Sequence, residues 1–383
     1  MIKIKLLIIG AGPFGLSMAA YCKHNKIDHL VVGNSMDFWK SNMPGGVFLR
    51  SGTDWHLDPL NIHTIKKYMK INDLKLKKSE PLSLDFYLGY VDWFVKEKGI
   101  QPINSIITKL DCLTGSRRRF TVELNNGEKI QAENVLLALG FKYFKNVPED
   151  LSLIFPENRF SHTCDLVELE KLKNKRCLII GGRQSAFEWA ALLSEAGAKS
   201  VYVSHRQDTP KFTESDWSWV LPMLDKIVED PGWFRNLSRK EREEIDKRFW
   251  TEGRLKLEPW LAPRLKSDSI KILPETNVTN CRELPNNDLH VEFDSGETLI
   301  LDYIILATGY KVNMNNIPFL SSGNILEKLE LINGFPVLDD YLQTNISGLF
   351  VTSMAASQQF GSFFAFTVSA NASARMVGRL FSQ

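Results

Sequence analysis

Two glycine-rich turns, about 170 residues apart, constrain the fold of this chain more than any other feature. The first spans residues 10–15 (GAGPFG) and the second spans residues 181–186 (GGRQSA). Each turn follows an apolar run that predicts a buried strand and precedes a run that predicts a helix. Two such units predict an α/β fold with two Rossmann-like dinucleotide-binding domains, built on parallel sheets with β-meanders.

The first turn has all three glycines of the GxGxxG pattern. Gly10 permits a tight turn, Gly12 lets backbone N–H groups approach a pyrophosphate, and Gly15 lets the helix pack closely on the strand. The helix N-terminus adds partial positive charge. The turn therefore predicts a dinucleotide site that also includes Pro13 and Phe14.

The second turn departs from this pattern. Gly181 and Ala186 occupy the first and third places, but Arg183 stands where the second glycine belongs. Its side chain hinders approach of the backbone to a pyrophosphate, yet its guanidinium could pair with phosphate directly. The alternative is a degenerate turn that holds no nucleotide. The residues expected to bind cofactor here are Gly181, Gly182, Arg183, Gln184, Ser185 and Ala186.

The strand that follows each turn ends without the acidic residue that usually binds ribose. The first ends near Asn34, whose amide can act as a neutral ribose ligand. The second ends at Ser204, His205 and Arg206, and an arginine at this place can meet a 2′-phosphate. We therefore expect Asn34, Ser204 and Arg206 to bind cofactor, and expect NADPH rather than NADH.

The second half of the chain repeats the first in outline. Hairpin signals at 125–127 and 294–296 each precede a strand that runs into glycine, at Gly140 and Gly309. Residues 207–266 interrupt this repeat and hold five of the nine tryptophans. They predict a helical insertion, in which Trp217, Trp219, Trp233, Trp250 and Trp260 either pack a core or line an apolar substrate site.

Composition excludes several other classes. The net charge is +2, which gives no sign of a nucleic-acid partner. The five cysteines are odd in number, widely spaced and without a CxxC pair, so we expect no disulfide framework and no dithiol reductase. The histidines lack zinc-ligand spacing, so no metal site is expected. No apolar stretch is long enough to span a membrane, and we expect a cytoplasmic protein.

Four segments resemble the class B flavin-dependent monooxygenases, within the wider flavoproteins that have two dinucleotide-binding domains. They are residues 10–15, residues 38–51 with Phe38-Trp39 and Leu49-Arg50-Ser51, residues 181–188, and residues 302–310, which contain an ATGY motif. Two segments depart from the family pattern. Residues 155–163 lack the glycine of the FxGxxxH segment, and residues 349–354 carry Ser-Met in place of Gly-Asp.

The resemblance implies a glutathione-reductase-like arrangement of two domains. An FAD-binding domain would comprise residues 1–165 and 306–383, and an NADPH-binding domain would comprise residues 166–305 with the insertion 207–266. It also implies further cofactor-binding residues. These are Trp39, Arg50, Ser51, Ile107, Thr308, Gly309, Ser353, Met354, Phe360 and Gly361.

The activity that the resemblance implies uses FAD, NADPH and dioxygen. A C4a-hydroperoxyflavin would oxygenate a nitrogen or sulfur nucleophile of a small molecule. His56 and Asp58 are the catalytic candidates, and the alternative is that both only hydrogen-bond loop backbone. Two other functions stay open: an NADPH-dependent flavin reductase or oxidase without oxygen insertion, and a non-catalytic flavin-binding protein. The oligomeric state is not predicted.

Overall fold

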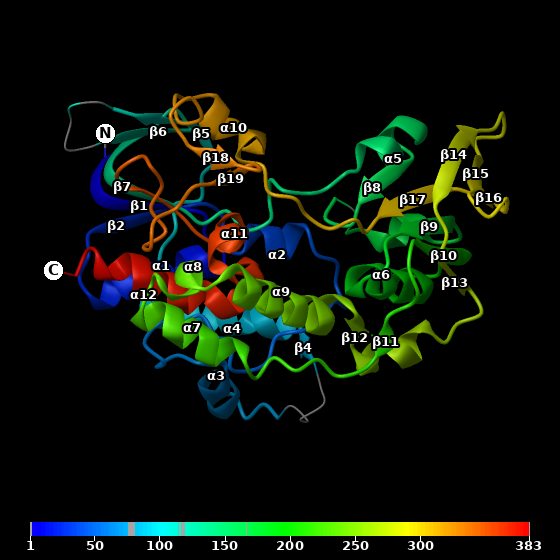
Figure 1. The fold of residues 1–383 in the computed structure, drawn as a ribbon, viewed down its shortest axis with the longest axis horizontal. Coiled ribbons are helices and arrows are strands. Elements are labelled where there is room, and N and C mark those ends of the chain that lie inside the picture. The colour runs from blue at the N-terminus through cyan, green and yellow to red at the C-terminus, as the bar shows by residue number, and fades with distance from the viewer. Residues whose placement is uncertain (1, 76–80, 114, 116–118, 166, 383) are drawn as a thin grey trace.

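The computed structural model describes residues 2–75, 81–113, 115, 119–165 and 167–382. It has two lobes, each built around its own sheet (Figure 1). The first lobe, on the left in Figure 1, contains both ends of the chain. The expected α/β fold with two dinucleotide-binding domains and parallel sheets with β-meanders is confirmed.

The sheet of the first lobe combines a parallel part and an antiparallel part. Its central strand β7 pairs in parallel with β1 along its length, with β20 at its C-terminal end and in antiparallel fashion with β6 at its other end. Both hairpin turns have the expected left-handed glycine, at Gly127 and Gly296. In order, the strands are β2 (His29–Val32), β1 (Ile2–Ile9), β7 (Lys129–Leu137), β6 (Phe120–Leu124) and β5 (Ile107–Cys112), with β20 (Leu349–Val351) beside β7.

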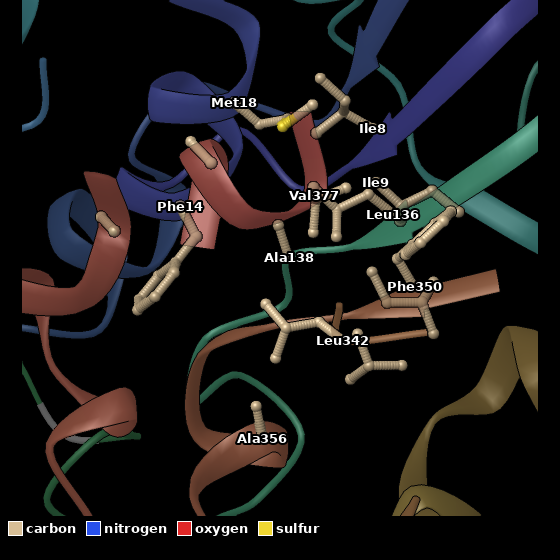
Figure 2. Close-up of a cluster of buried hydrophobic side chains, with 14 of the residues drawn as sticks. Ile8, Ile9, Phe14, Met18, Leu136, Ala138, Leu342, Phe350, Ala356 and Val377 are labelled. Carbon is tan, nitrogen blue, oxygen red and sulfur yellow. The ribbon is translucent and has the colours of Figure 1, made fainter. Parts of the chain in front are cut away.

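Two helices from opposite ends of the chain cover this sheet. Helix α1 (Pro13–His24) packs against α12 (Ala370–Arg379), and a Cβ on Gly378 would lie 2.2 Å from the Tyr21 ring. Figure 2 shows side chains of β1, β7, β20 and both helices meeting in one buried cluster, including Ile8, Leu136, Phe350 and Val377. The first turn is therefore fixed between the buried end of β1 and the buried first turns of α1.

The second lobe is the repeat that the sequence predicts. Its five strands are all parallel, and helix α6 (Gln184–Glu195) contributes to its core. A three-stranded antiparallel meander stands beside them. In order, the parallel strands are β13 (Ile270–Pro274), β10 (Ser200–His205), β9 (Arg176–Ile180), β17 (Tyr303–Leu306) and β8 (Phe160–His162), and the meander is β14 (Val278–Glu283), β15 (Leu289–Phe293) and β16 (Thr298–Leu301).

The inserted helices pack against the first lobe, although the chain enters and leaves them from the second. They are α7 (Val220–Glu229), α8 (Trp233–Asn236) and α9 (Arg239–Arg254), and α7 packs against α12 (Figure 1). Val220, Ile227 and Phe234 belong to the same buried core as β1 and α12. Conversely, β8 lies in the second sheet, although the predicted boundary at residue 165 assigned it to the first domain. Packing thus divides the chain differently from sequence order.

The chain passes between the lobes as paired segments. Asn146 N–H donates to Gly309 O at 2.9 Å and Thr308 Oγ1 donates to Asn146 O at 2.5 Å, so the two crossings near these residues run together. At the base of the insertion, β11 (Lys211–Phe212) pairs in parallel with β12 (Lys256–Leu257). These pairings hold the two glycine-rich turns on either side of one space.

The remaining elements are short segments that complete the two lobes. They are α2 (Asp37–Ser41), β3 (Phe48–Leu49), α3 (Ile65–Ile71), β4 (Leu82–Ser83), α4 (Leu84–Lys98), α5 (Glu149–Ile154), α10 (Pro318–Ser321), β18 (Leu331–Ile332), β19 (Phe335–Pro336) and α11 (Ser357–Phe360). Within the described ranges, none of the helices combines the length and apolar character needed to cross a membrane.

Candidate functional site

A cavity of about 980 Å³ lies between the lobes, and both glycine-rich turns line it. Residues 10–14 form part of its wall in the first lobe, and residues 181–185 form part of its wall in the second. A single space in contact with both turns is large enough for an extended ligand. The two turns that the sequence singled out therefore face one site.

The first turn has the geometry that each glycine predicts. Gly10 has φ +108°, and a Cβ there would lie 2.4 Å from Ala138 O. A Cβ on Gly15 would lie 1.8 Å from Gly10 O, so the helix touches the strand as expected. A Cβ on Gly12, by contrast, would meet no atom within 4 Å. The backbone at Gly12 is thus open to a pyrophosphate, and the turn fits an FAD.

Asn34 lies at the end of β2 and lines the same cavity. Its side-chain amide has no hydrogen-bond partner among the described residues, so it is free to bind a ribose hydroxyl. The preceding Gly33 has φ +137°, and a Cβ there would lie 3.2 Å from Ala11 N. That close approach holds Asn34 beside the first turn.

The second turn keeps the strand–turn–helix geometry despite Arg183. Gly181 has φ +149°, and a Cβ there would lie 2.5 Å from Ala307 O. Ala186 is fully buried, as the third position of the pattern requires. Gln184 Nε2 is buried and has no hydrogen-bond partner among the described residues. With the free N-terminus of α6, this donor fits a phosphate-bearing ligand.

Arg183 points away from its own turn and reaches the insertion. It donates to Arg254 O at 2.8 Å and to Gln207 Oε1 at 2.9 Å, and its guanidinium lies 5.0 Å from the centre of the Trp250 ring. Burial lowers the pKa of Arg183 from its usual value. Its side chain therefore does not fill the space over the turn, and its charge stays at the cavity wall.

Two further guanidinium groups line the cavity without a partner. Neither the guanidinium of Arg206, after β10, nor that of Arg254, at the end of α9, has a hydrogen bond or ion pair among the described residues. Burial lowers the pKa of Arg254, and the charges of Arg183 and Arg50 lower it further. Arg206 agrees with the expected 2′-phosphate position, whereas nothing in the sequence pattern pointed to Arg254.

Arg50 lines the cavity, but its guanidinium is already engaged. Nε donates to Glu258 Oε1 at 2.7 Å, Nη1 donates to Gly253 O at 2.7 Å, and Nη2 donates to Ser215 Oγ at 2.6 Å. Because the guanidinium has these partners, only the aliphatic part of the Arg50 side chain is left to contact a cofactor. What Arg50 does in this structure is hold the end of α9 against the first lobe.

Most of the predicted cofactor residues reach the cavity and some do not. In the lining are also Trp39, Ser51, Ile107, Ser204, Thr308 and Gly309. Outside it are Gly15 and Ala186, which pack the two turns, and also Ser353, Met354, Phe360 and Gly361. Ser353 is buried with φ +66°, and its Oγ accepts a hydrogen bond from Gly140 N at 3.1 Å. Phe360 is fully buried. This segment therefore contacts a wall residue, Gly140, without lining the cavity itself.

The C-terminal segment that does line the cavity follows a few residues later. Phe363, Ala365, Phe366, Thr367 and Val368 face it, immediately before α12. The residue pattern that could have found them is the polar-aromatic run 362–369 next to the last helix. The predicted residue Gly361, just before this segment, has φ +93° and lies outside the lining.

His56 and Asp58 lie outside the cavity lining, although their neighbour Trp55 lines it. Asp58 is fully buried and accepts hydrogen bonds from the N–H groups of Leu60, Ile62 and His63. Lys98 Nζ lies 2.8 Å from its carboxylate. Burial raises the pKa of Asp58, but Lys98 and these N–H groups outweigh burial, so the pKa is lowered overall. The arrangement gives Asp58 the loop-anchoring role that was the alternative.

Glu188 on α6 is a cavity residue whose role the sequence did not indicate. Its Oε1 accepts a hydrogen bond from Phe48 N at 2.8 Å, which joins the second lobe to β3 of the first. Burial raises the pKa of Glu188 to about 7, although the Phe48 N–H and the charges of Arg264 and Arg50 act in the opposite direction. A carboxyl group whose pKa is close to neutral pH thus lies at the junction of the lobes.

Four aromatic side chains from distant segments form a continuous wall of the cavity. Trp55 and Trp217 have ring centres 6.1 Å apart, Trp217 and Phe249 are 5.7 Å apart, and Phe249 and Phe366 are 5.6 Å apart. We call these four residues the aromatic quartet. Trp217 and Trp250 line the cavity, whereas Trp219, Trp233 and Trp260 do not line it and pack against the cores of the two lobes.

Comparison with protein families identifies one family along most of the chain. Residues 7–248 match a family model described as pyridine nucleotide-disulphide oxidoreductase, and residues 244–358 match a second model with the same description. Together these ranges include both glycine-rich turns and the quartet residues Trp55 and Trp217. The matches confirm that the chain is an oxidoreductase of the expected superfamily.

Individual relatives support the resemblance to flavin-dependent monooxygenases. A probable indole-3-pyruvate monooxygenase of Arabidopsis thaliana is 24% identical, over 86% of this chain and 79% of that protein. The FAD-bound cadaverine monooxygenase of Erwinia amylovora has a TM-score of 0.77 at 17% identity, covering 99% of this chain and 94% of that one. The ornithine N-hydroxylase of Kutzneria sp. 744, solved with reduced FAD, NADP⁺ and ornithine, has a TM-score of 0.78 at 12% identity, covering 99% of both chains. The expected pair of cofactors agrees with these proteins.

Proposed function

The chain belongs to the pyridine nucleotide-disulphide oxidoreductase family, and from that membership we propose that it is an FAD- and NADPH-dependent monooxygenase. Its substrate would be a nitrogen or sulfur nucleophile in a small molecule. One observation carries the proposal: both dinucleotide turns line the same cavity, so two cofactors can meet in it. The relatives described as monooxygenases add support from sequence and fold.

The disulfide-reducing branch of the family fits this chain less well. The sequence has no CxxC pair. The cysteine in the cavity lining, Cys164, is buried, and burial raises the pKa of its thiol to about 11. A thiol of that kind is a poor nucleophile at neutral pH, because only the thiolate attacks a disulfide.

FAD would lie along the first turn, with its pyrophosphate at Gly12 and a ribose at Asn34. When bound, FAD would accept a hydride from NADPH and activate dioxygen. The protein's contribution is placement and exclusion of water: the aromatic quartet and the segment 363–368 close the wall with mostly apolar side chains. No side chain in this scheme needs to act as a nucleophile.

NADPH would lie along the second turn, with phosphate at the N-terminus of α6. The unpaired guanidinium of Arg206 would meet the 2′-phosphate. A charge-assisted hydrogen bond of about 1.5–3 kcal/mol corresponds to roughly 10- to 100-fold preference for NADPH. Arg183 and Arg254 add positive charge at the same wall, which favours a dinucleotide with more negative charge.

The test uses FAD-loaded protein and follows four quantities in one reaction: NADPH consumed, dioxygen consumed, peroxide released and ¹⁸O incorporated into a sulfide or amine substrate. A monooxygenase puts one ¹⁸O atom into product for each NADPH. Full recovery of dioxygen as peroxide with every substrate would instead indicate an oxidase, and absence of flavin reduction by either nicotinamide would contradict both. Arg206→Gln should lose the preference for NADPH over NADH, whereas Arg282→Gln, an exposed arginine on β14, should keep it.

A further inference from the structure

The aromatic quartet brings together residues that are far apart in the sequence. Trp55 comes from the loop before α3, Trp217 from the loop before α7, Phe249 from α9 and Phe366 from the segment before α12. Ring centres 5.6–6.1 Å apart at tilted or edge-on angles are in the favourable range for aromatic contacts. All four rings also line the cavity.

The quartet retains capacity to bind a further ring. Trp55, Trp217 and Phe366 are only partly buried, so part of each ring faces the cavity. The indole Nε1 of Trp217 is itself buried and has no hydrogen-bond partner among the described residues. Tryptophan N–H groups that are buried usually find a partner. A ligand acceptor in the cavity would satisfy this one.

Positive charge already surrounds the quartet. The guanidinium of Arg50 lies 5.8 Å from the centre of the Trp217 ring, and that of Arg183 lies 5.0 Å from the centre of the neighbouring Trp250 ring. Arg254 adds a third guanidinium, one without a partner among the described residues. Arg50 is paired with the Glu258 carboxylate at 2.7 Å, so Arg183 and Arg254 are the cations near the quartet that oppose a substrate ammonium group at these rings.

Negative charge in the described lining is limited to three carboxyl groups. Asp37 is paired with Lys142 at 2.8 Å, Asp150 is on α5 of the second lobe, and Glu188 is bound to the Phe48 N–H. None of these carboxyl groups lies on a segment that contributes to the quartet. An alkylammonium ion at the quartet would thus face guanidinium groups without a dedicated carboxylate partner.

We propose that the aromatic quartet binds the substrate, and that this substrate is an aromatic compound that is neutral or acidic and not an aliphatic amine. This rests on the proposed function, because it places the substrate of that same reaction. A sulfide or an uncharged nitrogen is then a more compatible nucleophile for this site than a charged amine. The inference concerns binding, so its test begins without turnover.

The binding test uses oxidised, FAD-loaded protein without NADPH, with calorimetry and the flavin absorption spectrum as readouts. The probes are methyl phenyl sulfide, its non-aromatic analogue cyclohexyl methyl sulfide, 2-phenylethylamine and 1,5-diaminopentane. We expect methyl phenyl sulfide to bind about 3- to 10-fold more tightly than the cyclohexyl analogue, from one or two added aromatic contacts. Both amines should bind at least about tenfold more weakly than methyl phenyl sulfide. Tighter binding of either amine would overturn the proposal.

Matched variants locate the site. Trp217→Leu should weaken binding of methyl phenyl sulfide and remove its preference over the cyclohexyl analogue, and Phe366→Leu, at the other end of the quartet, should do the same. Trp233→Leu removes a tryptophan of the same insertion that does not line the cavity, and it should leave binding unchanged. If the two quartet variants lose FAD absorbance and keep probe selectivity in the remaining holoprotein, the quartet holds flavin and the proposal is wrong.

The two proposals can fail separately. Absence of ¹⁸O transfer with unchanged aromatic binding would count against the monooxygenase function only. Efficient ¹⁸O transfer to 1,5-diaminopentane but not to methyl phenyl sulfide would confirm the monooxygenase and reject the aromatic substrate class. The KM of methyl phenyl sulfide should rise in Trp217→Leu, whereas Trp233→Leu, outside the cavity lining, should keep both the wild-type KM and the wild-type rate of flavin reduction by NADPH.

Discussion

At the scale of single residues, Glu188 joins the two lobes through one hydrogen bond and carries the most strongly perturbed carboxyl group of the cavity wall. It is 4% exposed, and burial is the main reason that its pKa rises to about 7. In an unfolded chain the same carboxyl titrates near 4.5. The folded protein thus binds a proton that the unfolded chain has released, throughout the interval between these two values.

Glu188→Gln should change how stability depends on pH. Because the folded-state pKa is raised, the wild type loses stability as pH rises from about 4.5 to about 7 and then levels off. The glutamine keeps an oxygen for the Phe48 N–H but has no charge. Its free energy of unfolding should exceed that of the wild type by up to about 3 kcal/mol above pH 7 and match it at pH 4.

Urea unfolding at pH 4, 6 and 8 measures this difference. Glu195→Gln is the control on the same helix, because its half-exposed carboxylate pairs with Arg264 at the surface and should contribute less than about 1 kcal/mol. Parallel stability curves for wild type and Glu188→Gln across this range would show that the pKa of Glu188 is the same in the folded and unfolded states, which would contradict the prediction.

Prediction from sequence worked best for residues whose role is a backbone role. Gly10, Gly12 and Gly15 were identified by spacing, because the turn demands particular conformations and contacts at those places. The roles of Arg50 and Ser353 were not predicted. Arg50 bonds to Ser215 and Glu258, and Ser353 bonds to Gly140, and these partners are too distant in the sequence for a local pattern to indicate them.

At the scale of elements, the loop 54–63 is held in place by Asp58 and carries Trp55 to the cavity wall. The carboxylate accepts from three N–H groups of its own loop and pairs with Lys98, the last residue of α4. A buried carboxylate with these partners organises the loop around a single point. Its contribution to the site is the position of the Trp55 ring.

Asp58→Asn should lower stability and leave chemistry largely unchanged. The substitution leaves Lys98, whose side chain is 8% exposed, without its ion-pair partner, which costs about 3–5 kcal/mol. Thermal unfolding and the turnover number per FAD-loaded molecule are the two measurements. The exposed Asp54→Asn in the same loop is the control and should cost at most about 1 kcal/mol. A more than tenfold drop in turnover with unchanged stability would return Asp58 to the catalytic candidates.

The elements themselves followed largely from the sequence, since glycine turns and hairpin signals mark the ends of the strands. The placement of α7, α8 and α9 did not. An amphipathic helix shows which face it buries but not which surface it meets. These helices return to the first lobe because their apolar residues complete the core beside α12.

At the scale of the whole molecule, the buried residues form separate cores in the two lobes. Leu224 on α7 belongs to the core of the first lobe, and Leu193 on α6 belongs to a core of the second. They are 2% and 0% exposed, so truncation of either should cost about 2–5 kcal/mol through similar cavities. The functional consequences should differ because, in the proposed function, FAD would lie beside the first core and NADPH beside the second.

Leu224→Ala should lower the temperature at which FAD fluorescence appears, since the insertion shares its core with the FAD-binding turn. Leu193→Ala should weaken NADP⁺ binding and leave that temperature nearly unchanged. Thermal scans of flavin release and titrations with NADP⁺, carried out on both variants, measure whether the two lobes unfold together or separately. Equal shifts of FAD release in both variants would mean that the lobes unfold as one unit.

The C-terminal end of α9 receives an arginine from each lobe. Arg50 donates to Gly253 O and Arg183 donates to Arg254 O, so consecutive carbonyls of one helix terminus anchor both a flavin-side strand and the second turn. A substitution in α9 that adjusts the substrate wall therefore also shifts a residue of the nucleotide turn. Substitutions in α9 and in the second turn share these contacts, so we expect their effects on the proposed substrate and coenzyme sites to be non-additive.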